Sequence, residues 1–235
     1  LNLAECNKTS LKAFKVAIWS NDELAPVSKE IAQRCEEVGN KLNSVGTTVS
    51  FAAKPEHDFM KAEINYQLLL QSVMQSGLPE DEYQKIEELA SSLDKNDLSV
   101  DAILAKGTVL SHRNWLRQNY AREQIKISWS KFFEEWDVLI CPQLATTAIE
   151  HDHKKISERT VMVDNQEQRY FQQIFWPGLA VNAHLPSTVF PTGLSSDGMP
   201  IGLQVIGGAY EDKTTIKFAE LYEEEFKTFV VPNLD

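Results

Sequence analysis

A few side chains in this sequence have the chemistry of an active site. Cys141 could act as a nucleophile, with His151 or His153 as its base and Asp152 to orient that base. The alternative is a small buried cysteine at a strand end, beside a solvated loop. We favour the alternative, because buried cysteines are common and no catalytic signature surrounds this one.

The histidines are also candidate metal ligands. The His151-x-His153 spacing can place two imidazoles on one strand face, and His112 or His184 could add a third. The sequence shows no pattern of partners that would orient these rings, as metal sites usually require. We therefore predict no metal ligands and no cofactor.

A serine pair, Ser195-Ser196, lies between Gly193 and Gly198. The Asp-Gly step at residues 197–198 is a strong signal for a tight turn between two strands. Such a turn is exposed to solvent, and this one has no lysine beside the serines. We interpret the segment as a turn and predict no nucleophile there.

The elements that would position these groups begin with a strand at residues 15–19. Pro26 and Ser28 supply helix-start chemistry, apolar residues then follow a helical period, and Gly46 is placed to end the helix. Residues 47–52 predict the next strand. This βαβ unit favours a parallel pair with a right-handed crossover.

The middle of the chain predicts helices. They cover residues 57–75, a segment that begins at Pro79, residues 98–110 and residues 112–135, the last with Ser111 as N-cap. An apolar run at residues 137–141, stopped by Pro142, is typical of a strand buried on both faces. The polar residues 143–168 predict a long mobile loop.

Residues 175–210 predict two strands joined by a turn. Pro186 and Pro191 bracket the first apolar run and Pro200 opens the second. Proline cannot donate to a sheet ladder, so these positions suit strand ends or edges. A helix from residue 212 to about 227 follows. We predict one α/β domain over residues 1–235, with residues 1–14 as a connector and a mixed β-sheet of about five strands flanked by helices.

Composition narrows the function classes. The chain has 235 residues, 43% of them hydrophobic, and a net charge of −11, which repels nucleic acid and anionic membranes. No apolar run is long enough to span a membrane, and no signal peptide is evident. The cysteines Cys6, Cys35 and Cys141 are widely spaced and odd in number, so they are no disulfide framework and indicate the cytoplasm.

The C-terminal motifs resemble the end of the amidase-signature hydrolases. The shared motifs are Leu-Pro at residues 185–186, Pro-Thr-Gly at 191–193 and Pro-Ile-Gly-Leu-Gln at 200–204. The family also shows an arginine seven residues before a tryptophan, here Arg122 and Trp129, and an Asp-Val-Leu strand that ends in proline. The resemblance implies the fold of the C-terminal half of an amidase.

Members of that family hydrolyse non-peptide carboxamides to a carboxylic acid and ammonia or an amine. Their acyl-enzyme forms on a serine that a second serine, in a cis peptide, and a lysine activate. In the family these residues lie in a Gly/Ser-rich stretch of the N-terminal half, which nothing in this sequence matches. We therefore predict no catalytic residue in this chain and no activity alone. The alternative is a non-catalytic binding or assembly module with the same fold.

The resemblance also implies substrate-binding residues. They are Arg122, Gln143, Thr146, Trp176 and His184. A related arginine helps to hold the substrate in some members, and residues 143–147 form a strand-end loop that faces the family's active site. The alternatives are a helix-surface ion pair for the arginine, with Glu123 or near Asp137, and core packing for the tryptophan. The histidine stands where the family commonly has glycine.

The implied partners follow from the missing half. In the complete enzyme the chain would meet a small-molecule amide substrate and the N-terminal half of the amidase. The isolated chain would expose apolar surface and unpaired strand edges, so we also predict self-association. We expect neither nucleic acid nor membrane as a partner.

Overall fold

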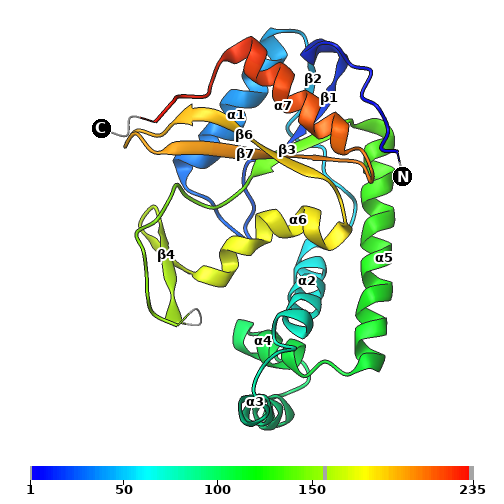
Figure 1. The fold of residues 1–235 in the computed structure, drawn as a ribbon, viewed down its shortest axis with the longest axis vertical. Coiled ribbons are helices and arrows are strands. Elements are labelled where there is room, and N and C mark those ends of the chain that lie inside the picture. Colours follow the sequence, from blue (N-terminus) through cyan, green and yellow to red (C-terminus); the bar gives the residue numbers. More distant parts are fainter. Residues whose placement is uncertain (1, 156–157, 233–235) are drawn as a thin grey trace. The chain divides into compact units, whose positions relative to one another are not determined.

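The computed structural model of the chain describes residues 2–155 and 158–232 (Figure 1). Its residues divide into two compact units, one of Leu1–Glu56 with Trp129–Asp235 and one of His57–Ser128. We call them the sheet unit and the helical unit and describe each by itself. That the two behave as one domain stays a prediction.

The sheet unit is built on a mixed five-stranded sheet with strand order β2-β1-β3-β7-β6. The strands are β1 (Lys15–Ile18), β2 (Thr48–Ser50), β3 (Val138–Pro142), β6 (Ser187–Leu194) and β7 (Pro200–Gly207). β1 runs parallel to β2 and β3, whereas β7 runs antiparallel to β3 and β6. The predicted mixed sheet of about five strands is confirmed, with β6, the strand that holds Pro191, at one edge.

The predicted βαβ unit is also confirmed. Helix α1 (Lys29–Ser44) begins at Ser28, whose side chain accepts a hydrogen bond from the Ile31 N–H. It ends before Gly46, which adopts a φ of 85°. Glycine reaches this left-handed conformation without steric cost, so the residue suits the position after a helix.

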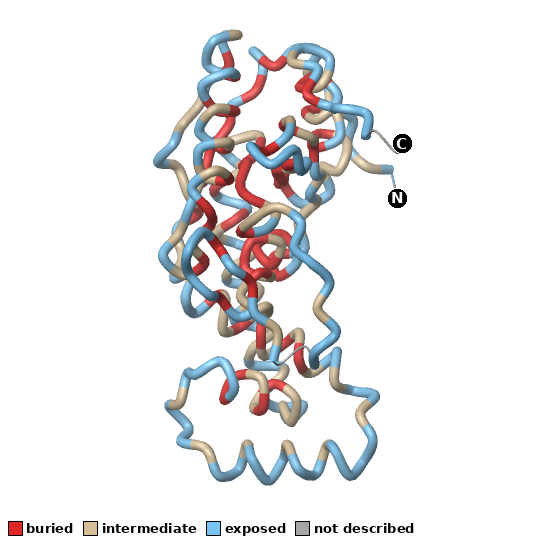
Figure 2. Tube along the Cα trace, turned by 90° about the vertical axis from the view of Figure 1, so that its left-hand side faces the viewer, coloured by how far each residue is buried: buried red, intermediate tan, exposed pale blue. Residues whose placement is uncertain are grey.

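Helices cover both faces of the sheet. In Figure 1, α1 and α7 (Asp212–Phe226) lie on one face and α6 (Phe175–Ala183) on the other. On the first face Phe190 of β6 packs edge-to-face against Phe218 and Tyr222 of α7. These rings belong to the core cluster that also holds the β1, β3 and β7 side chains on that face. Figure 2 colours the buried stretches of the trace red, and the residues of this core are among them.

Helix α6 corrects the prediction that residues 175–210 are strands and turn alone. Its sequence, FWPGLAVNA, is apolar on nearly every side, and a short apolar run does not distinguish a strand from a buried helix. Seven of its nine residues are buried. Pro177 is tolerated because it lies in the first turn, where the N–H groups lack helical acceptors.

The predicted loop at residues 143–168 is partly wrong. Its last part forms a hairpin of β4 (Thr160–Val163) and β5 (Gln166–Arg169), which pair antiparallel. Val161 and Val163 alternate with exposed residues and are buried, so the hairpin packs by one face. Asp164 at its turn has a φ of 52°. Residues 156–157 lie outside the described residues.

The helical unit consists of α2 (Phe59–Met74), α3 (Glu80–Ser92), α4 (Val100–Thr108) and the first part of α5 (His112–Glu135). All four helices were predicted, including the Ser111 cap, whose hydroxyl accepts from the Asn114 N–H. A Cβ on Gly107 would lie 2.8 Å from Gln71 Cβ, so glycine permits the close approach of α2 and α4. Within the described residues no helix is long and apolar enough to cross a membrane.

Candidate functional site

The site is organised around Gln204, a buried glutamine of β7. Its amide nitrogen donates to the carbonyls of Pro142, 3.1 Å away, and Trp176, 2.7 Å away. The same nitrogen lies 3.2 Å from Cys141 Sγ, and its oxygen accepts from the Ser187 hydroxyl at 3.0 Å. One side chain therefore joins the end of β3, the first turn of α6 and the edge strand β6.

Two further buried glutamines, Gln168 and Gln173, connect the loops that follow β1 and β3. The Gln173 oxygen accepts from the Ala145 N–H at 3.2 Å, and the Gln173 amide nitrogen donates to the Gln168 oxygen at 3.0 Å. Gln168 in turn donates to the Pro26 carbonyl at 2.8 Å. We call Gln168 and Gln173 the glutamine relay. The Ala145 carbonyl accepts from the Ser28 N–H at 2.8 Å, which ties the two loops together directly.

These bonds hold residues 143–147, the strand-end loop, at one end of the sheet. β1 and β3 are parallel, so the loops after them lie at the same edge, where ligands bind in α/β folds. Ala145 is buried, whereas Gln143 and Thr146 are half-buried. The loop is therefore anchored at its centre and presents an amide and a hydroxyl on either side of the anchor.

Trp176 and His184 lie at opposite ends of α6. The indole of Trp176 is fully buried, donates to the Ala25 carbonyl at 3.1 Å, and packs edge-to-face on Trp19. His184 is exposed at the C-terminal end, eight residues and therefore about 12 Å away along the helix axis. The burial and ring packing of Trp176 agree with the core-packing alternative. Contact of either residue with a substrate stays a prediction.

Arg122 belongs to the helical unit, on α5. Its Nη2 donates to Asn119 Oδ1, one turn earlier on the same helix. The alternative ion pairs with Glu123 or near Asp137 are not seen in the described residues, where Glu123 pairs with Lys126 and Asp137 pairs with Lys8. Its approach to the strand-end loop stays a prediction.

Cys141 is a structural residue. It is fully buried, and burial raises the pKa of its thiol far above the ordinary value, so the sulfur stays protonated and is a poor nucleophile. Asp152 accepts from the Lys154 N–H in the exposed loop. Among the residues that the structure describes, no group of three His, Cys, Asp or Glu side chains could hold a metal ion.

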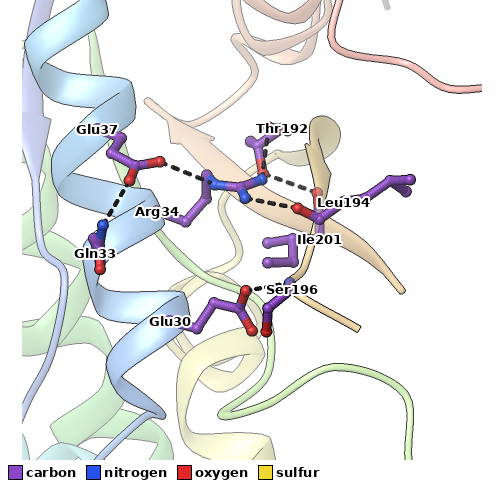
Figure 3. A network of polar contacts seen from close by, with 8 residues as sticks. All are labelled: Glu30, Gln33, Arg34, Glu37, Thr192, Leu194, Ser196 and Ile201. Carbon is purple, nitrogen blue, oxygen red and sulfur yellow. Dashed lines mark hydrogen bonds and ion pairs between the residues drawn. The ribbon is translucent and has the colours of Figure 1, made fainter. Parts of the chain in front are cut away.

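The Ser195-Ser196 pair lies in the turn between β6 and β7, as predicted. Figure 3 shows that α1 holds this hairpin: Arg34 donates to the carbonyls of Thr192 at 2.7 Å and Leu194 at 2.8 Å. Ser196 N–H donates to Glu30 at 2.6 Å. Ser195 is buried rather than exposed, and its hydroxyl accepts from the backbone of the turn at Met199. The pair has a role in turn geometry.

Comparison with known proteins identifies the fold. The amidase family matches residues 2–216. The chain belongs to the amidase family. A glutamyl-tRNA(Gln) amidotransferase subunit from Oceanobacillus iheyensis is 26% identical over 238 residues, which cover 94% of this chain and 46% of that protein. The corresponding protein from Thermosynechococcus vestitus is 36% identical over 111 residues, 47% of this chain and 21% of that protein.

Solved structures agree on the fold. A bacterial aryl acylamidase superposes with a TM-score of 0.65 at 16% identity, over 92% of this chain and 44% of that one. A glutamyl-tRNA(Gln) amidotransferase subunit from Thermotoga maritima gives a TM-score of 0.64 at 16% identity, over 96% and 46%. The chain thus spans less than half the length of these relatives.

Sequence reasoning missed the three glutamines that build the site. From the sequence, Gln204 is only the last residue of the motif at residues 200–204, and nothing marks Gln168 or Gln173 as site residues. A signal was present for the first of them, because a glutamine within the apolar run IGLQVIGG must find hydrogen-bond partners once the strand is buried. No comparable signal marks the relay, which lies in a polar segment.

Proposed function

We propose that this chain is the substrate-side half of an amidase that hydrolyses carboxamides to a carboxylic acid and ammonia or an amine. One observation carries the proposal: in a chain of the amidase family, the strand-end loop is anchored at the carboxyl ends of β1 and β3. That edge of an α/β sheet is where ligands collect.

In this proposal the side chains of this chain bind the substrate and do not attack it. Gln143 can donate to and accept from a carboxamide, and the Thr146 hydroxyl can do either. Arg122 holds a polar end of the substrate. His184 and Trp176, at the two ends of α6, form part of the wall of the substrate pocket. The serine, serine and lysine that form and break the acyl-enzyme come from an N-terminal half, which is also the main partner.

The proposal places the protein in the cytoplasm. The cysteines Cys6, Cys35 and Cys141 are all free thiols in the structure, which suits a reducing compartment. The acidic balance of the chain disfavours nucleic acid and anionic membranes as partners.

The proposal is tested by comparing this chain with the polypeptide of the complete reading frame that contains it. Both are incubated with a fluorophosphonate probe and with a panel of simple amides and esters. We expect this chain alone to show neither labelling nor turnover, since loss of a nucleophile and its base costs on the order of 10⁶ in rate in serine hydrolases. The complete polypeptide should show both, at a serine outside this chain.

Two results would contradict the proposal. Labelling of a serine or cysteine within residues 1–235, with robust turnover, would show that the chain carries its own nucleophile. A complete reading frame without a lysine and a Gly/Ser-rich stretch upstream would instead favour the binding or assembly module.

A further inference from the structure

The peptide groups of Ala145 are fixed from two directions. The N–H donates to Gln173 and the carbonyl accepts from the Ser28 N–H, so neither group depends on solvent. Ala145 is 3% exposed, and Gln168 and Gln173 are 8% and 7% exposed. The bonds therefore lie inside the protein, where an unpaired donor or acceptor is costly.

The glutamine relay has only one workable direction. At one end it must accept from a backbone N–H, that of Ala145, and at the other it must donate to a backbone carbonyl, that of Pro26. Two primary amides satisfy both ends when the oxygen of each faces Ala145 and the nitrogen of each faces Pro26. In that orientation the Gln173 nitrogen also donates to the Gln168 oxygen. A residue that only accepts, or one with no polar atom, breaks the relay at a buried position.

We propose that Gln173, oriented by Gln168, is a positioning residue that sets the strand-end loop for substrate binding. The inference rests on the proposed function, because it takes Gln143 and Thr146 as the groups that meet the amide substrate. In the described part of the chain, the hydrogen bonds of the Gln173 side chain go to Ala145 and Gln168 and not to these two side chains. Gln173 fixes the backbone between Gln143 and Thr146, and the position of that backbone sets the separation and direction of their side chains.

The neighbouring residue offers a matched control. Gln172 precedes Gln173 in the same 3-10 helix (Tyr170–Ile174) and donates to the Leu24 carbonyl at 3.2 Å. Gln172 is partly buried, and like Gln168 it binds the loop after β1. Of the two glutamines in this 3-10 helix, however, Gln173 is the one with a described hydrogen bond to the strand-end loop.

Hydrogen exchange on this chain tests the positioning step without any substrate. Gln173→Met, which keeps the length of the side chain and removes its amide, should lower the protection of the Ala145 amide about tenfold or more. Gln168→Met should act in the same direction, and Gln172→Met should leave Ala145 unchanged. The amides of β3 serve as a control, because their protection reports on the stability of the whole fold. If they also lose protection in Gln173→Met, the effect of that variant is not local, and the test then rests on Gln168→Met.

Kinetics of the complete polypeptide test the consequence for substrate binding. Gln173→Met and Gln168→Met should each raise KM for the amide about tenfold with a smaller change in kcat, and the double variant should be no worse than Gln173→Met, since the two residues act as one unit. Equal effects of Gln172→Met and Gln173→Met, or additive effects in the double variant, would overturn the proposal. So would lost protection at Ala145 with KM unchanged. A wild-type polypeptide without turnover would instead refute the proposed function, and the positioning role with it, whatever the exchange result.

Discussion

At the scale of single residues, His184 shows how a departure from a family pattern acquires a physical meaning. The residue follows α6 with φ 56° and ψ 45°, and the Leu185 N–H returns to the Ala180 carbonyl. This is the left-handed position after a helix, where glycine is usual because it lacks a Cβ. The left-handed backbone therefore explains why the family commonly has glycine at this position. In this chain His184 adopts the same conformation with a side chain, which strains the backbone.

We expect His184→Gly to raise the free energy of unfolding by about 0.5 kcal/mol. Removal of the side chain relieves a left-handed strain of about 1–2 kcal/mol. The greater conformational freedom of glycine in the unfolded chain offsets up to about 1 kcal/mol of this stabilisation. Chemical denaturation measures the difference. The control is His184→Val, whose branched Cβ suits this conformation least and which should lower the free energy of unfolding. If the free energy of unfolding of His184→Val exceeds that of the wild type, the residue is not strained.

The sequence could predict the loop but not what holds it. Residues 143–147 follow an apolar strand and a proline, so their position at a strand end was readable. Gln173 lies 28 residues from Ala145, and Gln168 lies 142 residues from Pro26. A glutamine in a polar stretch has no periodicity that reports a partner so far away.

At the scale of elements, α1 and the β6–β7 hairpin are bound by polar contacts as well as by the core. Arg34 supplies two carbonyls of β6 with donors near the bulge between Pro191 and Leu194. Its side chain is 15% exposed, so water replaces it poorly. The hairpin turn thus depends on a residue about 160 positions earlier.

Arg34→Met should lower the free energy of unfolding by roughly 2 kcal/mol, because two carbonyls lose charged donors while the apolar stem of the side chain is kept. Gln33→Met is the matched control: Gln33 bonds only Glu37 at the surface in Figure 3, and its loss should change stability by less than about 0.5 kcal/mol. Equal urea midpoints for both variants would contradict the anchoring role.

Element prediction succeeded where a local signal existed. Ser28 and Ser111 marked helix starts and Gly46 marked an end, because capping depends on neighbours within a turn. It failed for α6 and for the β4–β5 hairpin. The first is apolar on nearly all sides. The second has strands of only four residues, and every residue of β5, Gln166–Arg169, is polar.

At the scale of the whole sheet, β6 is an edge strand that is only partly closed. The Thr228 hydroxyl donates to the Pro191 carbonyl, and Arg34 donates to the carbonyls of Thr192 and Leu194. Pro186 accepts from the Gly207 N–H, so by alternation the backbone groups of Ser187 and Val189 point away from β7. Val189 is 53% exposed, and Asp197 is the one charged residue from 185 to 210.

We therefore expect the isolated chain to self-associate through this kind of surface, since uncharged open edges pair with other strands. Light scattering at micromolar concentration should detect species heavier than the 26.6 kDa chain. Val189→Lys should shift the population toward monomer, while Met162→Lys, at an exposed position on the separate β4–β5 hairpin, should not. A soluble wild-type monomer under these conditions would show that the edge needs no cover.

The parallel pairing of β1 with β3 has a consequence for the order of events at the ribosome. Val16 pairs with Val138, so α1, β2 and the entire helical unit are synthesised between two strands that end up adjacent. At about 5–20 residues per second, β1 waits on the order of ten seconds for its neighbour. During that interval β1 has only β2 beside it, and the helical unit, whose contacts are local, can fold first. A chaperone that binds the nascent chain would find its target in the segment that carries β1, α1 and β2.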